Sequence, residues 1–175
     1  RHASHLLGLY PGNAITDKTP ELIEACKVSL LDRGFGQKSG ANGSGWGKAN
    51  KVNLWARAKD GKRAYSMLRE LINKNIAPNL WDFHPPYQMD GNCGYTSGVC
   101  EMLCYSSDDI IELLPALPEE WKNGSVKGLC ARGGYSLDFT WENGEIKSLS
   151  VYSSCGKKTA RIKTGDEIKT VKTVG

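Results

Sequence analysis

The sequence predicts a mainly α-helical part followed by a small antiparallel β part. In the first part, apolar residues recur at the spacing of one helix face, as at Ala64, Leu68, Leu71 and Ile72. Further along, polar and apolar residues alternate as in a half-buried strand, with the apolar set at Tyr135, Leu137, Phe139 and Trp141. The proline-rich stretch 114–121 marks the change of period, so helices and strands are expected in separate parts and not in alternation.

The first two helices are expected before residue 34. Residues 1–10 have the pattern of a helix end, which Pro11-Gly12 stops. A second helix is expected at about 20–33, because Thr19 can cap its start and Gly34 is a common C-terminal signal.

Three more helices are expected after a flexible loop. Residues 35–45 are rich in Gly, Ser, Asn and Lys, which favours the loop. A third helix is expected at about 47–59. The short turn Asp60-Gly61 makes it an antiparallel pair with the fourth helix that follows. A fifth helix is expected at about 95–106.

The β part contains one clear hairpin. Asn143-Gly144 is a strong hairpin signal between the alternating strand and a return strand that reaches Val151. Two further strands are expected at 159–163 and 168–174.

The composition limits the function classes. The chain has 175 residues, of which 39% are hydrophobic and 24% charged, as in ordinary globular proteins. The net charge of +4 is small and the Lys and Arg residues are scattered, so no nucleic-acid partner is expected. No apolar run is long enough to span a bilayer, so no membrane partner is expected. There is no Cys-x-x-Cys pair, and neither a zinc site nor another cofactor is expected.

Residues 79–92 are the segment richest in chemically useful side chains. They include two carboxylates, a histidine, a glutamine and two asparagines. Pro85 and Pro86 fix their own φ and bias the residue before each of them toward extended geometry. A loop stiffened in this way holds polar groups in defined directions, which a sugar-binding or acid–base site requires.

This loop resembles the corresponding loop of glycoside hydrolase family 95, the inverting α-L-fucosidases. Further segments resemble the same family in the same order, at residues 1–6, 10–12, 45–49, 54–57, 113–118 and 124–128. An ordered set of this kind is more specific than any single motif, and the resemblance covers roughly residues 1–152.

The resemblance implies a fold and an activity. Residues 1–112 would be the last hairpins of an (α/α)6 toroid, and residues 113–175 the C-terminal β-domain beside it. Five helices cannot close a six-hairpin toroid, so the chain is expected to be inactive alone and to need the upstream part of the same polypeptide. The implied reaction is inverting hydrolysis of terminal α-L-fucosyl residues, typically α-1,2-linked, of a fucosylated oligosaccharide or glycan.

The family pattern implies that Asp90 is the catalytic base. An inverting glycosidase needs one carboxylic acid to protonate the leaving oxygen and one base to activate a water molecule. The resemblance puts the acid, a glutamate, and the asparagines that polarise the water upstream of this chain. From the residues alone, Asp90 beside Gly91 is better explained as a turn-forming residue.

Five further residues are candidates for binding the sugar, namely His2, Trp46, His84, Gln88 and Asn92. Imidazole and amide groups suit sugar hydroxyls, and the rings of Trp46 and Trp81 suit the C–H face of a pyranose. Structural alternatives stay open, namely packing for His2 and Trp46, and fixing of the loop for His84 and Gln88.

Other polar side chains in these motifs are expected to be structural. Asp82 is expected to cap a helix or to bond His84. The cations Lys48, Lys51 and Arg57 are expected on a helix surface or in ion pairs within the toroid.

Three other functions stay open. Gly47, Asn50 and Cys93 depart from the residues usual in the family, which leaves room for a relative that acts on α-L-galactosides. A noncatalytic sugar-binding remnant of the same fold is the second possibility. A structural helical module without a ligand is the third, and the polar loop at 79–92 disfavours it.

The six cysteines are expected to be free thiols. Cys100 and Cys104 are four residues apart on one expected helix, where bridging geometry is unfavourable, and Cys26 lies in an apolar stripe. Alkylation under denaturing, non-reducing conditions is expected to add six labels to the intact mass. A mass that is short by a pair of labels would show a disulfide.

Overall fold

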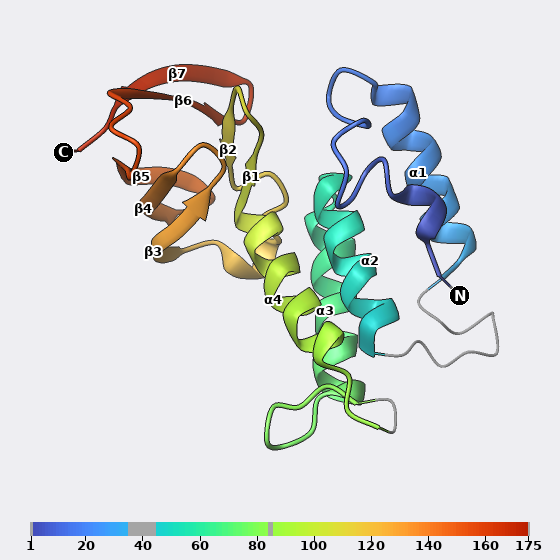
Figure 1. The fold of residues 1–175 in the computed structure, drawn as a ribbon. Coiled ribbons are helices and arrows are strands. Elements are labelled where there is room, and N and C mark those ends of the chain that lie inside the picture. Colours follow the sequence, from blue (N-terminus) through green and yellow to red (C-terminus); the bar gives the residue numbers. More distant parts are fainter. Residues whose placement is uncertain (1, 35–44, 84–85, 175) are drawn as a thin grey trace.

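The computed structural model describes residues 2–34, 45–83 and 86–174, which form helices followed by two small β-sheets (Figure 1). A 3-10 turn at Ser4–Leu6 precedes the α-helices, which are α1 (Pro20–Asp32), α2 (Gly45–Arg57), α3 (Gly61–Asn75) and α4 (Met89–Leu103). Figure 1 shows the helices on one side of the molecule and the sheets on the other, with α4 leading from one part into the other. The expected order of a helical part and then a small β part is confirmed.

The prediction that residues 1–10 end a helix is wrong for the residues described. Beyond the 3-10 turn, the N–H groups of Leu9 and Tyr10 both donate to the Leu6 carbonyl, at 2.9 and 3.2 Å. The chain then turns away, because Pro11 has no N–H with which to continue the pattern. Leu6 and Leu9 are buried in the helical core, so the segment is still fixed by packing.

The helix α1 has nearly the expected bounds, but the Thr19 side chain does not cap it. The Thr19 hydroxyl donates to the Thr16 carbonyl and accepts from the Thr16 N–H, both at 3.1 Å, within the turn that precedes the helix. Gly34 has a φ of 58°, the left-handed conformation expected at a helix end. The loop expected at 35–45 lies outside the described residues, except for Gly45, which begins α2.

The helices α2 and α4 pack closely and run in parallel. Along α2, Val52 meets Gly98 of α4, and one turn later Arg57 meets Glu101. A Cβ atom on Gly98 would stand 2.5 Å from Cγ1 of Val52, so a side chain at this position would force the helices apart. Arg57 Nε donates to the Glu101 carboxylate at 2.5 Å. Arg57 therefore forms an ion pair between two helices, which is one of its two predicted roles.

The helix α3 follows α2 after the short turn that the sequence predicts. Asp60 caps α3, since its carboxylate accepts the Arg63 N–H at 2.9 Å. The buried face of α3 includes Ala64, Met67, Leu68 and Leu71. Ile72, the remaining member of the predicted apolar stripe, is 47% exposed.

Two lysines of α2 are buried, which corrects the expectation of a helix surface. Lys48 Nζ donates to Asn75 Oδ1 at 2.9 Å and lies 3.2 Å from Glu70 Oε1. Lys48 therefore forms an ion pair with Glu70, the predicted alternative to a place on the helix surface. Lys51 Nζ donates to the Gly34 carbonyl at 2.6 Å, beside the C-terminal end of α1, where a cation is favourable. Burial lowers the pKa of Lys51.

The β part contains two sheets, ordered β1-β2-β6-β7 and β3-β4-β5. Their strands are β1 (Cys104–Ser106), β2 (Ile111–Leu113), β3 (Gly124–Ala131), β4 (Tyr135–Glu142), β5 (Glu145–Ser153), β6 (Thr159–Thr164) and β7 (Glu167–Lys172). All neighbours are antiparallel except β2 and β6, which are parallel. Two parallel strands need a long connection between them, and the connection from β2 to β6 contains the whole three-stranded sheet.

The hairpin between β4 and β5 has the predicted turn, whereas the sequence pattern does not predict β1, β2 and β3. Asn143 and Gly144 have φ values of 52° and 79°, as this hairpin turn requires. The strands β1 and β2 have three residues each, which is too short to show a period. A bulge between Val126 and Leu129 interrupts the alternation in β3.

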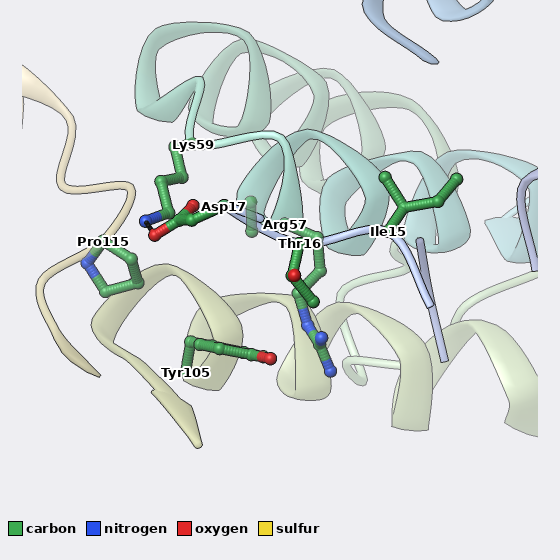
Figure 2. Close-up of a pocket in the computed structure, with 8 residues that line it drawn as sticks. Ile15, Thr16, Asp17, Arg57, Lys59, Tyr105 and Pro115 are labelled. Atoms are coloured by element: carbon green, nitrogen blue, oxygen red, sulfur yellow. Dashed lines mark hydrogen bonds and ion pairs between the residues drawn. The ribbon is translucent and has the colours of Figure 1, made fainter. Parts of the chain in front are cut away.

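Four charged side chains join the helical part to the sheet that contains β2 and β6. Lys59, just after α2, lies 2.6 Å from Asp17 and 2.8 Å from Glu112 of β2. Lys163 of β6 lies 2.7 Å from Asp17 and 3.2 Å from Glu112. Figure 2 shows the Lys59 and Asp17 side chains pointing toward one another, with Pro115 beside them.

Two of these groups have pKa values that reflect the pairing. Burial alone would raise the pKa of Asp17, but hydrogen bonds and charges from Lys163 and Lys59 hold it below the ordinary value. Burial alone would lower the pKa of Lys163, but its contacts with Asp17 and Glu112 raise it. Both groups are therefore held in their charged forms, and we refer to the four residues as the junction cluster.

The variant Glu112→Gln is expected to lower the free energy of unfolding by about 1–3 kcal/mol, because it removes the less exposed carboxylate of the junction cluster. The matched control is Glu145→Gln, since Glu145 pairs with Lys147 at the surface with 76% of its side chain exposed. That change is expected to stay within about 0.5 kcal/mol. Urea unfolding measures both, and equal effects would show that the cluster does not stabilise the junction.

Candidate active site

The polar segment after α3 folds back on itself before α4 begins. The Phe83 N–H donates to the Asn75 carbonyl at 2.9 Å, and the Ala77 N–H donates to the Trp81 carbonyl at 2.8 Å. Leu80, at the tip, has a φ of 66°. We call the described residues 76–83 and 86–88 the site loop. Its backbone contacts fix the directions of the side chains that leave it.

Asp82 is the buried centre of the site loop. It is fully buried, between the first residues of α2 and α4. A Cβ atom on Gly45 would stand 1.8 Å from Oδ1 of Asp82, and one on Gly91 would stand 1.3 Å from Oδ2. Any side chain at either glycine would therefore occupy the place of the carboxylate.

Gln88 and Asn92 bind the site loop to the two helices. The Trp46 N–H of α2 donates to Gln88 Oε1 at 3.3 Å. The Asp82 N–H donates to Asn92 Oδ1, and Asn92 Nδ2 donates to the Leu80 carbonyl, both at 2.8 Å. These contacts agree with the expectation that Gln88 orients the loop, and they give Asn92 the same task.

Asp90 is exposed in the first turn of α4. The helix begins at Met89 and ends at Leu103, so the prediction of a helix at 95–106 is wrong at both ends. Asp90 Oδ1 accepts the Gly91 N–H at 3.1 Å, at a helix end that favours a negative charge. Asp90 is thus a solvent-facing carboxylate in the first turn of a helix.

The aromatic side chains near the loop divide into packed and exposed groups. The Trp46 ring rests against α4, where a Cβ on Gly94 would stand 3.3 Å from it, and Trp46 is half-buried. Trp81 and Tyr87 contact each other with ring centroids 4.9 Å apart, and they are 55% and 39% exposed. Trp81 therefore presents more ring surface than Trp46 does.

The three histidines have different surroundings. His2 is exposed, and its carbonyl accepts from Arg33 Nη1 at 3.0 Å. His5 Nε2 lies 2.7 Å from the Ser29 hydroxyl of α1, which is a packing role. His84 lies outside the described residues, so the expected Asp82–His84 contact stays a prediction.

The cavity in Figure 2 lies away from the site loop. It has a volume of about 20 Å³ and is lined at its helical side by Ala56, Arg57 and Lys59, at the C-terminal end of α2. A space of this size holds one water molecule and no sugar. Within residues 2–34, 45–83 and 86–174, no three His, Cys, Asp or Glu side chains are grouped to hold a metal ion, and no helix is long and apolar enough to cross a bilayer.

Comparison with known families accounts for almost the whole chain. Residues 1–103 match the model of the glycosyl hydrolase family 95 catalytic domain, and residues 105–174 match that of the glycoside hydrolase family 95 C-terminal domain. The chain is thus a glycoside hydrolase segment, with part of a helical catalytic domain and a C-terminal β-domain. It belongs to glycoside hydrolase family 95. The predicted boundary between the helical catalytic part and the β-domain, between residues 112 and 113, stays a prediction.

Three curated relatives are similar to this chain. Alpha-L-fucosidase 2 of Arabidopsis thaliana is 37% identical over 166 residues, which cover 87% of this chain and 19% of that protein. Probable alpha-fucosidase A of Aspergillus oryzae is 34% identical over 82% of this chain and 22% of its own length. Probable alpha-fucosidase A of Aspergillus niger is 32% identical, with 93% and 23% covered. The chain spans about a fifth of the length of these relatives.

Proposed function

We propose that this chain is part of an inverting exo-glycosidase that hydrolyses terminal α-L-fucosyl residues, typically α-1,2-linked, of oligosaccharides or glycans. Asp90 is the proposed catalytic base. The observation that supports this role most directly is its position, since it is an exposed carboxylate on the first turn of α4, inside the segment that matches the family's catalytic domain.

In this proposal Asp90 acts on a water molecule. Its carboxylate accepts a proton as the water attacks the anomeric carbon, on the face opposite the leaving oxygen, so the configuration inverts. A second carboxyl group must protonate the leaving oxygen from the other side of the sugar. We assign that group to the upstream part of the same polypeptide, and the chain alone is therefore expected to be inactive.

The surrounding residues hold the fucosyl group and the loop. His2, Trp46, His84, Gln88 and Asn92 stay the proposed sugar-binding residues. Gln88 and Asn92 contribute first by fixing the site loop beside the first turn of α4, which carries Asp90. Trp81 joins this set, because its exposed ring offers an apolar face of the kind that pyranose C–H groups contact.

The upstream polypeptide is also the proposed structural partner. Several apolar side chains on the helices are exposed in this chain, namely Leu22, Val28, Leu31 and Ile72. In an (α/α)6 toroid, each hairpin packs against two neighbours, so we propose that upstream helices cover these residues.

In the full-length protein, Asp90→Asn is expected to reduce turnover by about 10²–10⁴-fold, because general-base assistance is lost. Folding and fucose binding are expected to persist, since the amide keeps the size of the carboxylate. Release of the aglycone from an aryl α-L-fucoside measures turnover, and calorimetry measures fucose binding. Asp109→Asn, at another exposed aspartate, is the control and should retain activity.

The outcomes separate the competing functions. Near-normal turnover of Asp90→Asn would remove Asp90 from the mechanism. A wild-type protein that binds fucose without hydrolysing any fucoside would support the noncatalytic sugar-binding alternative. Faster hydrolysis of α-L-galactosides than of α-L-fucosides would change the proposed sugar and keep the reaction.

A further inference from the structure

The parallel packing of α2 and α4 creates an electrostatic problem at the site end. Val52 meets Gly98 and Arg57 meets Glu101, so the two helix N-termini lie at the same end. Each N-terminus carries about half a positive charge and N–H groups without partners inside the helix. Two such ends placed together repel one another unless a negative group lies between them.

The Asp82 carboxyl group lies at that place, where its ionised form would supply the negative charge. Its oxygens occupy the space that a Cβ atom would take on Gly45 of α2 and on Gly91 of α4. The residue has no exposed surface, so solvent would screen a charge on this carboxylate little. Its main chain is also fixed, since its N–H donates to Asn92 Oδ1 and its carbonyl accepts from the Gln88 N–H at 2.9 Å.

We propose that Asp82 is a positioning residue for the base, an inference that rests on the proposed function of Asp90. Its carboxylate holds the first turns of α2 and α4 at one distance. Gly91, which the carboxylate touches, is bonded directly to Asp90. A shift of the α4 end would therefore move the Asp90 carboxylate relative to the water that it must deprotonate, and a displacement of about 1 Å can cost about 10²-fold in rate.

The test uses the full-length protein with Asp82→Asn, which keeps the shape and removes the charge. The turnover number for an activated aryl α-L-fucoside is expected to fall about 10–100-fold, while KM stays within about twofold, because the sugar contacts are retained. The matched control is Asp60→Asn, since Asp60 caps α3 at the opposite end of the helices. It is expected to lower the melting temperature and to leave turnover unchanged.

A double-variant cycle shows whether Asp82 acts through Asp90. If it does, adding Asp82→Asn to Asp90→Asn causes no further loss of the residual turnover. If Asp82→Asn lowers the turnover of the Asp90→Asn protein as much as it lowers that of the wild type, the positioning role is overturned. Asp90 would remain the proposed base. Near-normal turnover of Asp90→Asn alone would instead overturn the proposed function, so the two failures are distinguishable.

A second variant covers the case in which Asp82→Asn does not fold. Gly45→Ala leaves both carboxylates in the sequence and pushes the Asp82 side chain from the α2 side, where the new Cβ would stand 1.8 Å from it. The same fall in turnover with an unchanged KM is expected. Wild-type turnover in Gly45→Ala, or in a folded Asp82→Asn protein, would contradict the proposal.

Discussion

The close parallel contact of α2 and α4 is the constraint on which the rest of the structure depends. Gly98 lets Val52 approach, and Asn53 crosses the interface to donate to the Gly94 carbonyl at 2.8 Å. Since the helices run in the same direction, their two N-termini lie at one end of the pair and their two C-termini lie at the other. The N-terminal ends meet at the site loop, and the C-terminal ends meet the β part.

Helix N-termini favour a negative charge and helix C-termini favour a positive one. The chain places buried or paired charged side chains at both ends of the helix pair. At the N-terminal ends a carboxylate, Asp82, lies between the helices. At the other ends, Arg57 pairs with Glu101, and Lys59 joins the junction cluster. The helix pair thus connects a chemically exposed end, where Asp90 faces solvent, to an end that is fixed against the β-sheet.

Local patterns in the sequence predicted what depends on neighbours along the chain. The periodicity of α3 and the Asn143-Gly144 hairpin are examples, because helix stripes and turns are set within a few residues. Because Asp90 and Gly91 have the pattern of a turn, the sequence predicts the start of α4 at Tyr95, whereas the helix begins at Met89.

The burial of Asp82 could not be predicted in this way, because the glycine that makes room for it, Gly45, is far away in the sequence. Likewise, Lys48 and Lys51 have the character of surface residues until Glu70 and the end of α1 are placed beside them.

The anomeric form of the first product tests the central claim that Asp90 activates water for direct displacement. The full-length protein is mixed with an α-L-fucoside, and proton NMR spectra are recorded before mutarotation mixes the anomers. The account predicts that β-L-fucose accumulates first and that the α-anomer follows only at the rate of mutarotation. If α-L-fucose is the first product, the reaction proceeds with retention, and Asp90 is not the base of an inverting reaction.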